Sequence, residues 1–153
     1  MLRSDYNGQN CSIARALELV GERWTLLILR DVFLGTYRFE ELQGNLGIAR
    51  NVLQARLERL VQEGVLRRVR YQERPPRYEY RLTRKGTDLW PVLVAMLKWG
   101  DRHLAPGGPP VVIRHRECGG EIDDRRRCQR CGADLEAWEV VAQRGPGMTP
   151  APA

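Results

Sequence analysis

The sequence predicts a mainly α-helical fold with one small β-hairpin (α+β class), followed by a small cysteine-rich appendage. Three observations lead to this prediction. Apolar residues recur at helical spacing through most of residues 12–103. One segment near the middle alternates with a period of two around a Pro-Pro pair. Three of the four cysteines follow a Gly- and Pro-rich stretch near the C-terminal end.

Four helices are expected before the hairpin. Residues 12–20 form the first, because Ile13, Leu17 and Val20 share one face and Gly21 follows. Residues 22–33 are apolar on most sides, which is typical of a buried helix. A short helix over 39–46 and a longer one over 49–63 come next. The core positions of the longer helix are Val52, Leu53, Leu57, Leu60 and Val61, and Gly64 stands at its C-terminal cap.

Residues 65–71 and 78–82 then read as two strands joined by a six-residue tip. Proline has no N–H to donate to a ladder, so Pro75 and Pro76 must lie at the tip. Thr83 can cap the next helix, whose apolar positions run to His103, and Pro91 should kink or restart it.

A helix, a tight turn, a longer helix and a basic hairpin make up the winged helix-turn-helix. In that fold the second helix of the pair inserts its N-terminal turns into the major groove. With the apolar face inward, Asn51 and Ala55 point outward, Gln54 lies at the edge, and Ala49 and Arg50 start the helix. Asn and Gln can pair with adenine through two hydrogen bonds.

The hairpin region from Val65 to Lys85 carries eight basic residues against two glutamates. The two prolines stiffen the tip, so less conformational entropy is lost when its cations meet a sugar-phosphate backbone. A net charge of +6 also favours an anionic partner such as DNA, although a solvated basic surface is the alternative. The predicted DNA contacts are Arg38, Ala49, Arg50, Asn51, Gln54, Ala55, Arg70, Arg74 and Arg77.

The stretch from Cys11 to Gly100 resembles the HxlR-type branch of the MarR-like winged-helix transcription regulators. The resemblance lies in residues 21–29, 38–42 and 47–48, the segment 53–64, the motif Pro-Pro-Arg-Tyr-Glu-Tyr at 75–80, residues 82–86 and Trp99-Gly100. It implies a transcriptional regulator, expected to be a repressor, that binds an inverted repeat as a homodimer. The helices 12–20 and 89–103 would join the two protomers, and the apolar surface of the second helix agrees with this.

Members of that family often respond to electrophiles, oxidants or aldehydes, some through a cysteine near the N-terminus. Cys11 matches that position, and Arg15, one turn further on, is placed to lower the pKa of its thiol. A buried, inert cysteine that packs like a small hydrophobic residue is the alternative.

The appendage contains His115, Cys118, Cys128 and Cys131 in the spacing H-x2-C-x9-C-x2-C. Two close pairs on two turns can hold one tetrahedral zinc, and a segment this short needs such a crosslink because it has little core of its own. A structural Zn²⁺ is therefore predicted. Water, Glu121 or Asp123 could replace His115 as the fourth ligand, and a metal-free redox pair of Cys128 and Cys131 is the rival interpretation.

These patterns divide the chain into a DNA-binding and dimerisation domain (1–104), a linker (105–110), the cysteine-rich appendage (111–140) and a disordered tail (141–153). The polar start of the chain lacks an apolar signal region, and no apolar run could span a bilayer, so we expect a cytoplasmic protein with no membrane partner.

An enzyme is not expected, because the sequence shows no nucleophile–base pairing, phosphate loop or paired carboxylate motif. The alternative to a DNA-binding regulator is a protein-interaction module, since winged helices also dock proteins and the appendage could supply the partner surface.

Overall fold

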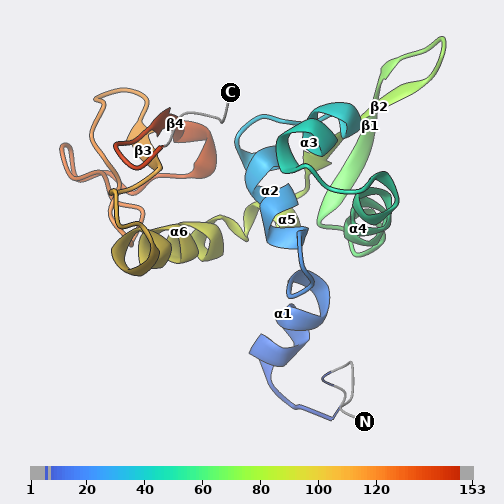
Figure 1. Cartoon of the computed structure of the whole chain (residues 1–153), viewed down its shortest axis with the longest axis horizontal. Coiled ribbons are helices and arrows are strands. Elements are labelled where there is room, and N and C mark those ends of the chain that lie inside the picture. The colour runs from blue at the N-terminus through green and yellow to red at the C-terminus, as the bar shows by residue number, and fades with distance from the viewer. Residues whose placement is uncertain (1–5, 7, 149–153) are drawn as a thin grey trace. The chain divides into compact units, whose positions relative to one another are not determined.

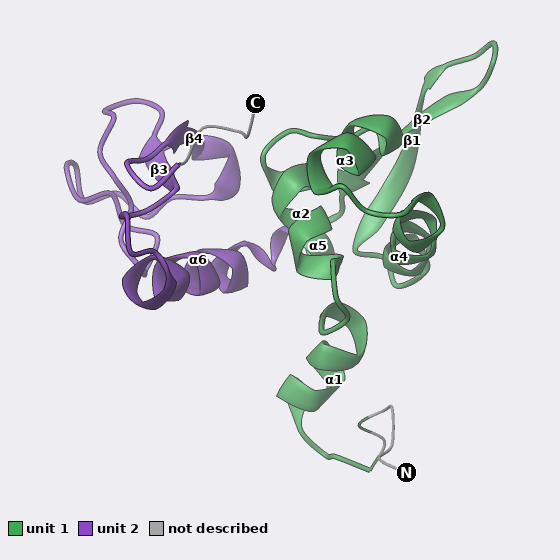
Figure 2. Ribbon diagram, viewed as in Figure 1, with its two compact units in different colours: residues 1–86 green, residues 87–153 purple. Residues whose placement is uncertain are grey.

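The computed structural model describes residues 6 and 8–148 (Figure 1). The chain forms two compact units, residues 1–86 and 87–153 (Figure 2). The sequence pattern predicts a later boundary, at residues 105–110. The helix over 90–104, which was assigned to the DNA-binding domain, therefore belongs by its contacts to the unit that carries the cysteines.

The first unit contains the predicted order of helices and hairpin, which confirms the predicted fold class. Its elements are α1 (Ser12–Val20), α2 (Thr25–Phe33), α3 (Phe39–Leu46), α4 (Arg50–Gln62), β1 (Leu66–Gln72), β2 (Arg77–Leu82) and α5 (Arg84–Thr87). The second helix begins at Thr25 rather than at residue 22, because Trp24 has a positive φ of 82° that a continuous helix does not allow. Among the described residues, no helix is both long enough and apolar enough to cross a membrane.

The core of the first unit lies where α2 packs against α3 and β2, and where α4 packs against β1. Its fully buried apolar side chains are Ile28, Leu29, Val32, Leu42, Leu53, Leu57, Leu60, Val65 and Leu66. Each such side chain stabilises the fold by about 1.5–3 kcal/mol relative to an exposed position. The apolar side of α4 is therefore fixed inward, and its polar side faces outward.

The hairpin pairs β1 with β2 in antiparallel register, from Leu66 opposite Leu82 to Arg70 opposite Tyr78. Residues 73–76 form the tip, so both prolines lie there as predicted. The Tyr80 N–H donates to the Tyr37 carbonyl at 2.8 Å, which attaches the hairpin to the segment before α3. Thr83 caps α5 as predicted, since its Oγ1 accepts the Gly86 N–H at 3.1 Å.

The second unit begins with α6 (Trp90–Leu104), which has Pro91 in its first turn, so this proline marks a helix start rather than a kink. Several large apolar side chains of α6 are exposed, namely Val92, Met96, Trp99 and Leu104. The remaining elements are β3 (Val111–His115), a 3-10 turn η1 (Ala137–Glu139) and β4 (Val140–Arg144). β3 and β4 pair antiparallel, from Val111 opposite Arg144 to His115 opposite Val140.

The predicted disordered tail is wrong for residues 141–148, and residues 149–153 lie outside the described part of the chain. Residues 141–144 complete the ladder with β3, and that pairing satisfies their backbone groups. The Gly145 N–H then donates to the Pro110 carbonyl and the Gly147 N–H to the Pro109 carbonyl, at 2.8 and 3.1 Å. The end of the predicted linker is thus part of the folded second unit. A proline has no N–H to donate, but its carbonyl oxygen can still accept a hydrogen bond.

Candidate DNA interface and metal centre

The polar side of α4 carries the side chains that the sequence predicts to contact DNA bases. Ala49, Arg50, Asn51, Gln54 and Ala55 are all exposed, while Leu53 and Leu57 on the opposite side are fully buried. Gln54 Nε2 donates to Glu58 Oε1 at 3.0 Å. This contact orients the Gln54 amide along the helix surface. It uses the amide nitrogen as the donor, so the amide oxygen takes no part in it.

Arg50 joins the start of α4 to the start of α3. Its guanidinium lies 2.8 Å from Glu40 Oε1 and stacks over the Phe39 ring at 4.7 Å from the ring centroid. Both partners of the ion pair are largely exposed, so the pair contributes little to stability. Arg50 can therefore exchange Glu40 for a stronger anionic partner without a large loss.

The hairpin supplies a second group of cations. Arg70 donates to Glu73 at 3.1 Å and to the Tyr78 hydroxyl at 3.2 Å. The Tyr78 hydroxyl, and to a smaller extent Glu73, raises the pKa of the Arg70 guanidinium, which stays charged. Arg74 and Arg77 are exposed on either side of the Pro75-Pro76 pair. The structure thus presents all three predicted phosphate contacts on the outer half of the hairpin.

A hollow of about 650 Å³ lies between the hairpin and the starts of α3 and α4. Three of the predicted contacts line it, namely Arg38, Arg50 and Arg77. Asn51, Ala55, Arg70 and Arg74 are not among its lining residues. A neighbouring hollow of about 430 Å³ is lined by Arg50 and Gln54.

Sequence reasoning missed Arg68, which lines both hollows and stacks over the Tyr78 ring at 4.1 Å. Arg68 precedes Arg70 by two residues in β1, so both side chains lie on the same face of the hairpin. The same period of two that marked the strand could have identified this residue.

The four predicted metal ligands come together in the second unit. Ligand atoms of His115, Cys118, Cys128 and Cys131 all lie within 4.8 Å of one another. Cys118 Sγ and Cys131 Sγ are each 3.3 Å from His115 Nδ1, and Cys118 Sγ is 3.4 Å from Cys128 Sγ. Ligand atoms around a tetrahedral zinc are about 3.5–3.8 Å apart. The donor set and its spacing fit such an ion.

The ligands stand on two matching turns. Each turn has the pattern ligand-x2-Cys-Gly, with the glycine N–H donating to the carbonyl of the first ligand at 2.9 Å. The glycines are Gly119 and Gly132, with φ values of +74° and +77°. Glycine adopts this left-handed conformation without steric cost, and each turn thereby aims two ligand atoms at one point.

The pKa values of the two neighbouring thiols shift in opposite directions, since burial and the Cys128 sulfur raise the pKa of Cys118 while the pKa of Cys128 is lowered. Backbone N–H groups of Cys131 and Arg130 face the Cys128 sulfur and lower its pKa to about 6, which favours the thiolate that binds metal. His115 turns Nδ1 toward the sulfurs, and its Nε2 lies 4.0 Å from Glu117. The alternative ligands are engaged elsewhere, since Glu121 pairs with Arg114 and Asp123 accepts two backbone N–H groups.

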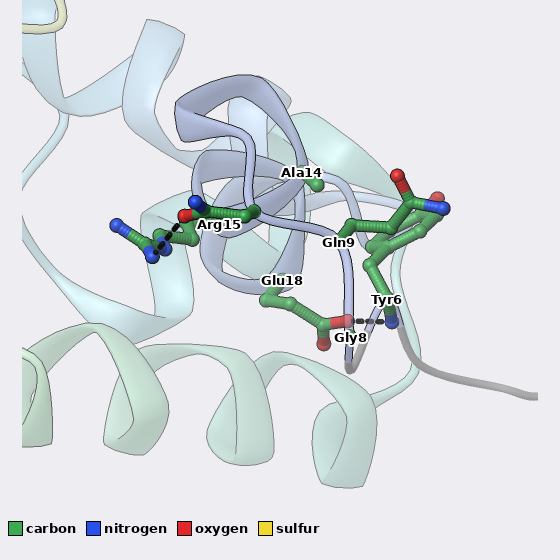
Figure 3. A pocket seen from close by; sticks show the side chains of 7 residues that line it. Tyr6, Gly8, Gln9, Ala14, Arg15 and Glu18 are labelled. Atoms are coloured by element: carbon green, nitrogen blue, oxygen red, sulfur yellow. Dashed lines mark hydrogen bonds between the residues drawn. The ribbon is translucent and has the colours of Figure 1, made fainter.

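Cys11 is exposed immediately before α1, and its thiol is not buried as the alternative interpretation required. The amides of Ala14 and Ile13 in the first turn of α1 lower the pKa of this thiol. Arg15 does not contribute to this shift, and its guanidinium donates instead to Asn10 Oδ1 at 2.9 Å (Figure 3). A pocket of about 320 Å³ adjoins this region, lined by Tyr6, Gly8, Gln9, Asn10, Ala14, Arg15 and Glu18.

The known proteins that are similar to this chain are described as regulators or transcription factors. The family model described as HxlR-like helix-turn-helix matches residues 19–107. An uncharacterised HTH-type transcriptional regulator of Mycobacterium tuberculosis is 50% identical over 138 residues, covering 90% of this chain and 87% of that protein. The crystal structure of PA1607, a candidate transcription factor, superposes with a TM-score of 0.70 at 38% identity, over 90% of this chain and 97% of that one. The redox regulator HypR in its oxidised form gives a TM-score of 0.57 at 29% identity, over 61% of this chain and 97% of HypR.

The extent of these matches bears on the cysteine-rich unit. A continuous match of 138 residues leaves only 15 of the 153 outside, so it includes residues 16–138 and all four ligand positions. The HypR match covers a much smaller share of the chain. The length of the chain beyond the helix-turn-helix region is therefore shared with the mycobacterial regulator.

Proposed function

This chain belongs to the HxlR-like helix-turn-helix family of transcriptional regulators, and we propose that it is a repressor that binds an inverted-repeat operator as a homodimer. The relatives are regulators of transcription and not enzymes, in agreement with the sequence analysis. One observation carries the proposal: the start of α4 adjoins a hollow that is lined by arginines from the residue before α3, from α4 and from the hairpin.

We propose that the N-terminal turns of α4 enter the major groove. Asn51 and Gln54 would read base edges there, because their amides offer a donor and an acceptor side by side. Arg70, Arg74 and Arg77 would hold the sugar-phosphate backbone, which fixes affinity and register rather than sequence choice. A twofold-symmetric dimer would then read two half-sites about one helical turn apart.

The exposed apolar side chains of α1 and α6 support the dimer. Ile13 and Leu17 of α1 are 71% and 40% exposed, and Met96 and Trp99 of α6 are 53% and 57% exposed. Monomeric proteins rarely leave side chains of this size uncovered in groups. We propose that a second copy of the chain covers them.

We propose Cys11 as a sensor of oxidants or electrophiles. The thiol is exposed, and its lowered pKa increases the fraction of reactive thiolate at neutral pH. Among the similar proteins, HypR is described as a redox regulator.

For the second unit we propose one structural Zn²⁺ held by His115, Cys118, Cys128 and Cys131. The converging ligand atoms and the low pKa of Cys128 support this. When bound, the ion would crosslink the two turns, which the small core of this unit cannot do alone. The rival, a metal-free disulfide of Cys128 and Cys131, is an outcome of the metal analysis described in the Discussion.

The proposed function is tested by selecting genomic DNA fragments bound by the purified protein, and by repeating the selection after treatment with hydrogen peroxide. We expect the bound fragments to share an inverted repeat. Oxidation should weaken the binding of these fragments by the wild type but not by Cys11→Ser. A protein that stays monomeric and binds no duplex at low ionic strength would contradict the proposal and favour a protein-interaction module.

A further inference from the structure

Glu79 is an acidic residue in the most basic part of the molecule. It lies in β2 with a side chain that is only 14% exposed. Its Oε2 accepts hydrogen bonds from Arg81 Nη2 at 2.7 Å and from Arg81 Nε at 3.1 Å. Its Oε1 lies 3.5 Å from the Nε of Arg38, the residue that precedes α3. One carboxylate therefore joins two arginines that are 43 residues apart in sequence.

Two aromatic rings complete this arrangement. The Arg38 guanidinium lies over the Tyr71 ring at 4.3 Å from the centroid, and the Arg81 guanidinium lies over the Tyr37 ring at 3.5 Å. Each arginine is thus held at one edge by Glu79 and across its face by a tyrosine. The arrangement fixes the start of α3 relative to the hairpin.

A carboxylate in this position is unfavourable for DNA binding on charge alone, because it repels phosphate. Arg81, followed by Arg38, lowers the pKa of Glu79 through hydrogen bonds and charge, so this carboxylate is ionised at neutral pH. A simple basic surface would be better without it. The presence of Glu79 is explained if its contact with Arg38 strengthens DNA binding by more than its repulsion of phosphate weakens it.

Arg38 is placed to meet DNA. It lines the 650 Å³ hollow together with Arg50 and Arg77, and its side chain is 49% exposed. Glu79 approaches it closest through Nε, and Tyr71 covers one face of the guanidinium. An arginine held in this way keeps its two terminal nitrogens for a phosphate, and it loses less side-chain entropy when the phosphate arrives.

We infer that Glu79 is a positioning residue that presents the Arg38 guanidinium to a DNA phosphate. This inference rests on the proposed function, since it requires that this face of the molecule binds DNA.

The test compares Glu79→Gln with Glu73→Gln, both in the full chain, on a fluorescein-labelled mixed-sequence duplex across a salt series. Glu73 belongs to the same hairpin and pairs with Arg70, but its side chain is 79% exposed and contacts no other element through that pair. Loss of charge alone should strengthen binding in both variants. Positioning predicts that Glu79→Gln instead weakens binding, roughly five- to tenfold, and lowers the salt slope by about 0.9, one phosphate contact.

A double-mutant cycle identifies the partner. In an Arg38→Ala background, Glu79→Gln should cause no further loss, because the residue it positions is gone. If Glu79→Gln lowers the melting temperature, Glu79→Asp decides instead: it keeps the charge but withdraws the carboxylate from Arg38, and positioning predicts weaker binding. Unchanged or tighter binding by Glu79→Gln, or by Glu79→Asp where that variant decides, would overturn the inference. A wild-type protein that ignores the duplex would overturn the proposed function itself.

Discussion

The Sγ atom of Cys118 lies 3.4 Å from the Sγ atom of Cys128, although ten residues separate them in the sequence. A disulfide would bring the two sulfurs to about 2.05 Å, and both carry free thiols. Two sulfurs at this distance, with His115 Nδ1 and a third sulfur beside them, converge on a common point. The four side chains of this cluster could therefore hold one metal ion.

The purified protein is expected to carry about one zinc per chain. Cys128→Ser should lose most of it, because Cys128 is the buried cysteine among the ligands and the backbone stabilises its thiolate. Elemental analysis of dialysed protein measures the content, and Cys11→Ser, which changes a cysteine of the other unit, should keep the zinc. Full zinc content in Cys128→Ser, or a Cys128–Cys131 disulfide in the wild type, would contradict the site.

Chelation of this metal should unfold the second unit locally. Without the ion, β3 and β4 lose the crosslink that fixes their connecting turns, so the amides of residues 111–115 and 140–144 should lose protection from hydrogen exchange. Leu53 and Leu57 of α4 are fully buried in the first unit, and the amides of α4 should stay protected. Equal loss of protection in α4 would mean that the two units do not fold separately.

Arg74→Ala and Arg77→Ala should each weaken binding to every duplex sequence. These residues flank the proline tip, where phosphate contacts are sequence-independent. Each lost contact should lower the slope of log affinity against log salt concentration by about 0.9. Arg125→Ala, which removes an exposed arginine of the second unit, serves as the control and should leave the slope unchanged. An unchanged slope in both variants would show that the hairpin tip does not contact the DNA backbone.

Asn51→Ala should change sequence choice and leave the salt slope intact. Its side chain is exposed in the first turn of α4, where an amide can pair with adenine through two hydrogen bonds. Loss of such a pair costs about 1–3 kcal/mol of discrimination at one base position. Competition between the selected operator and single-base variants measures this. Gln129→Ala, which removes an exposed amide of the second unit, should discriminate like the wild type.

The winged helix-turn-helix could be predicted because its signals are local. Apolar spacing located the helices, and the proline pair located the tip of the hairpin. The Glu79 arrangement could not be predicted, because it depends on where the start of α3 lies against β2, which pattern alone does not reveal. The strand over 140–144 was missed for a similar reason. Its partner, β3, is about thirty residues earlier, and the Gly- and Pro-rich sequence after it pointed to disorder.

Met96→Glu should convert the protein to a monomer and reduce its affinity for operator DNA. Met96 is 53% exposed on α6, and a second copy that covered it would have to bury the introduced carboxylate without a partner. A dimer that contacts two half-sites binds more tightly than either protomer alone, and this gain in affinity is lost when the dimer separates. Light scattering after size-exclusion chromatography measures the mass. Trp138→Glu is the matched control, because Trp138 is 65% exposed outside α1 and α6, and this variant should remain dimeric. If Met96→Glu remains dimeric at the same concentrations, α6 does not form the interface.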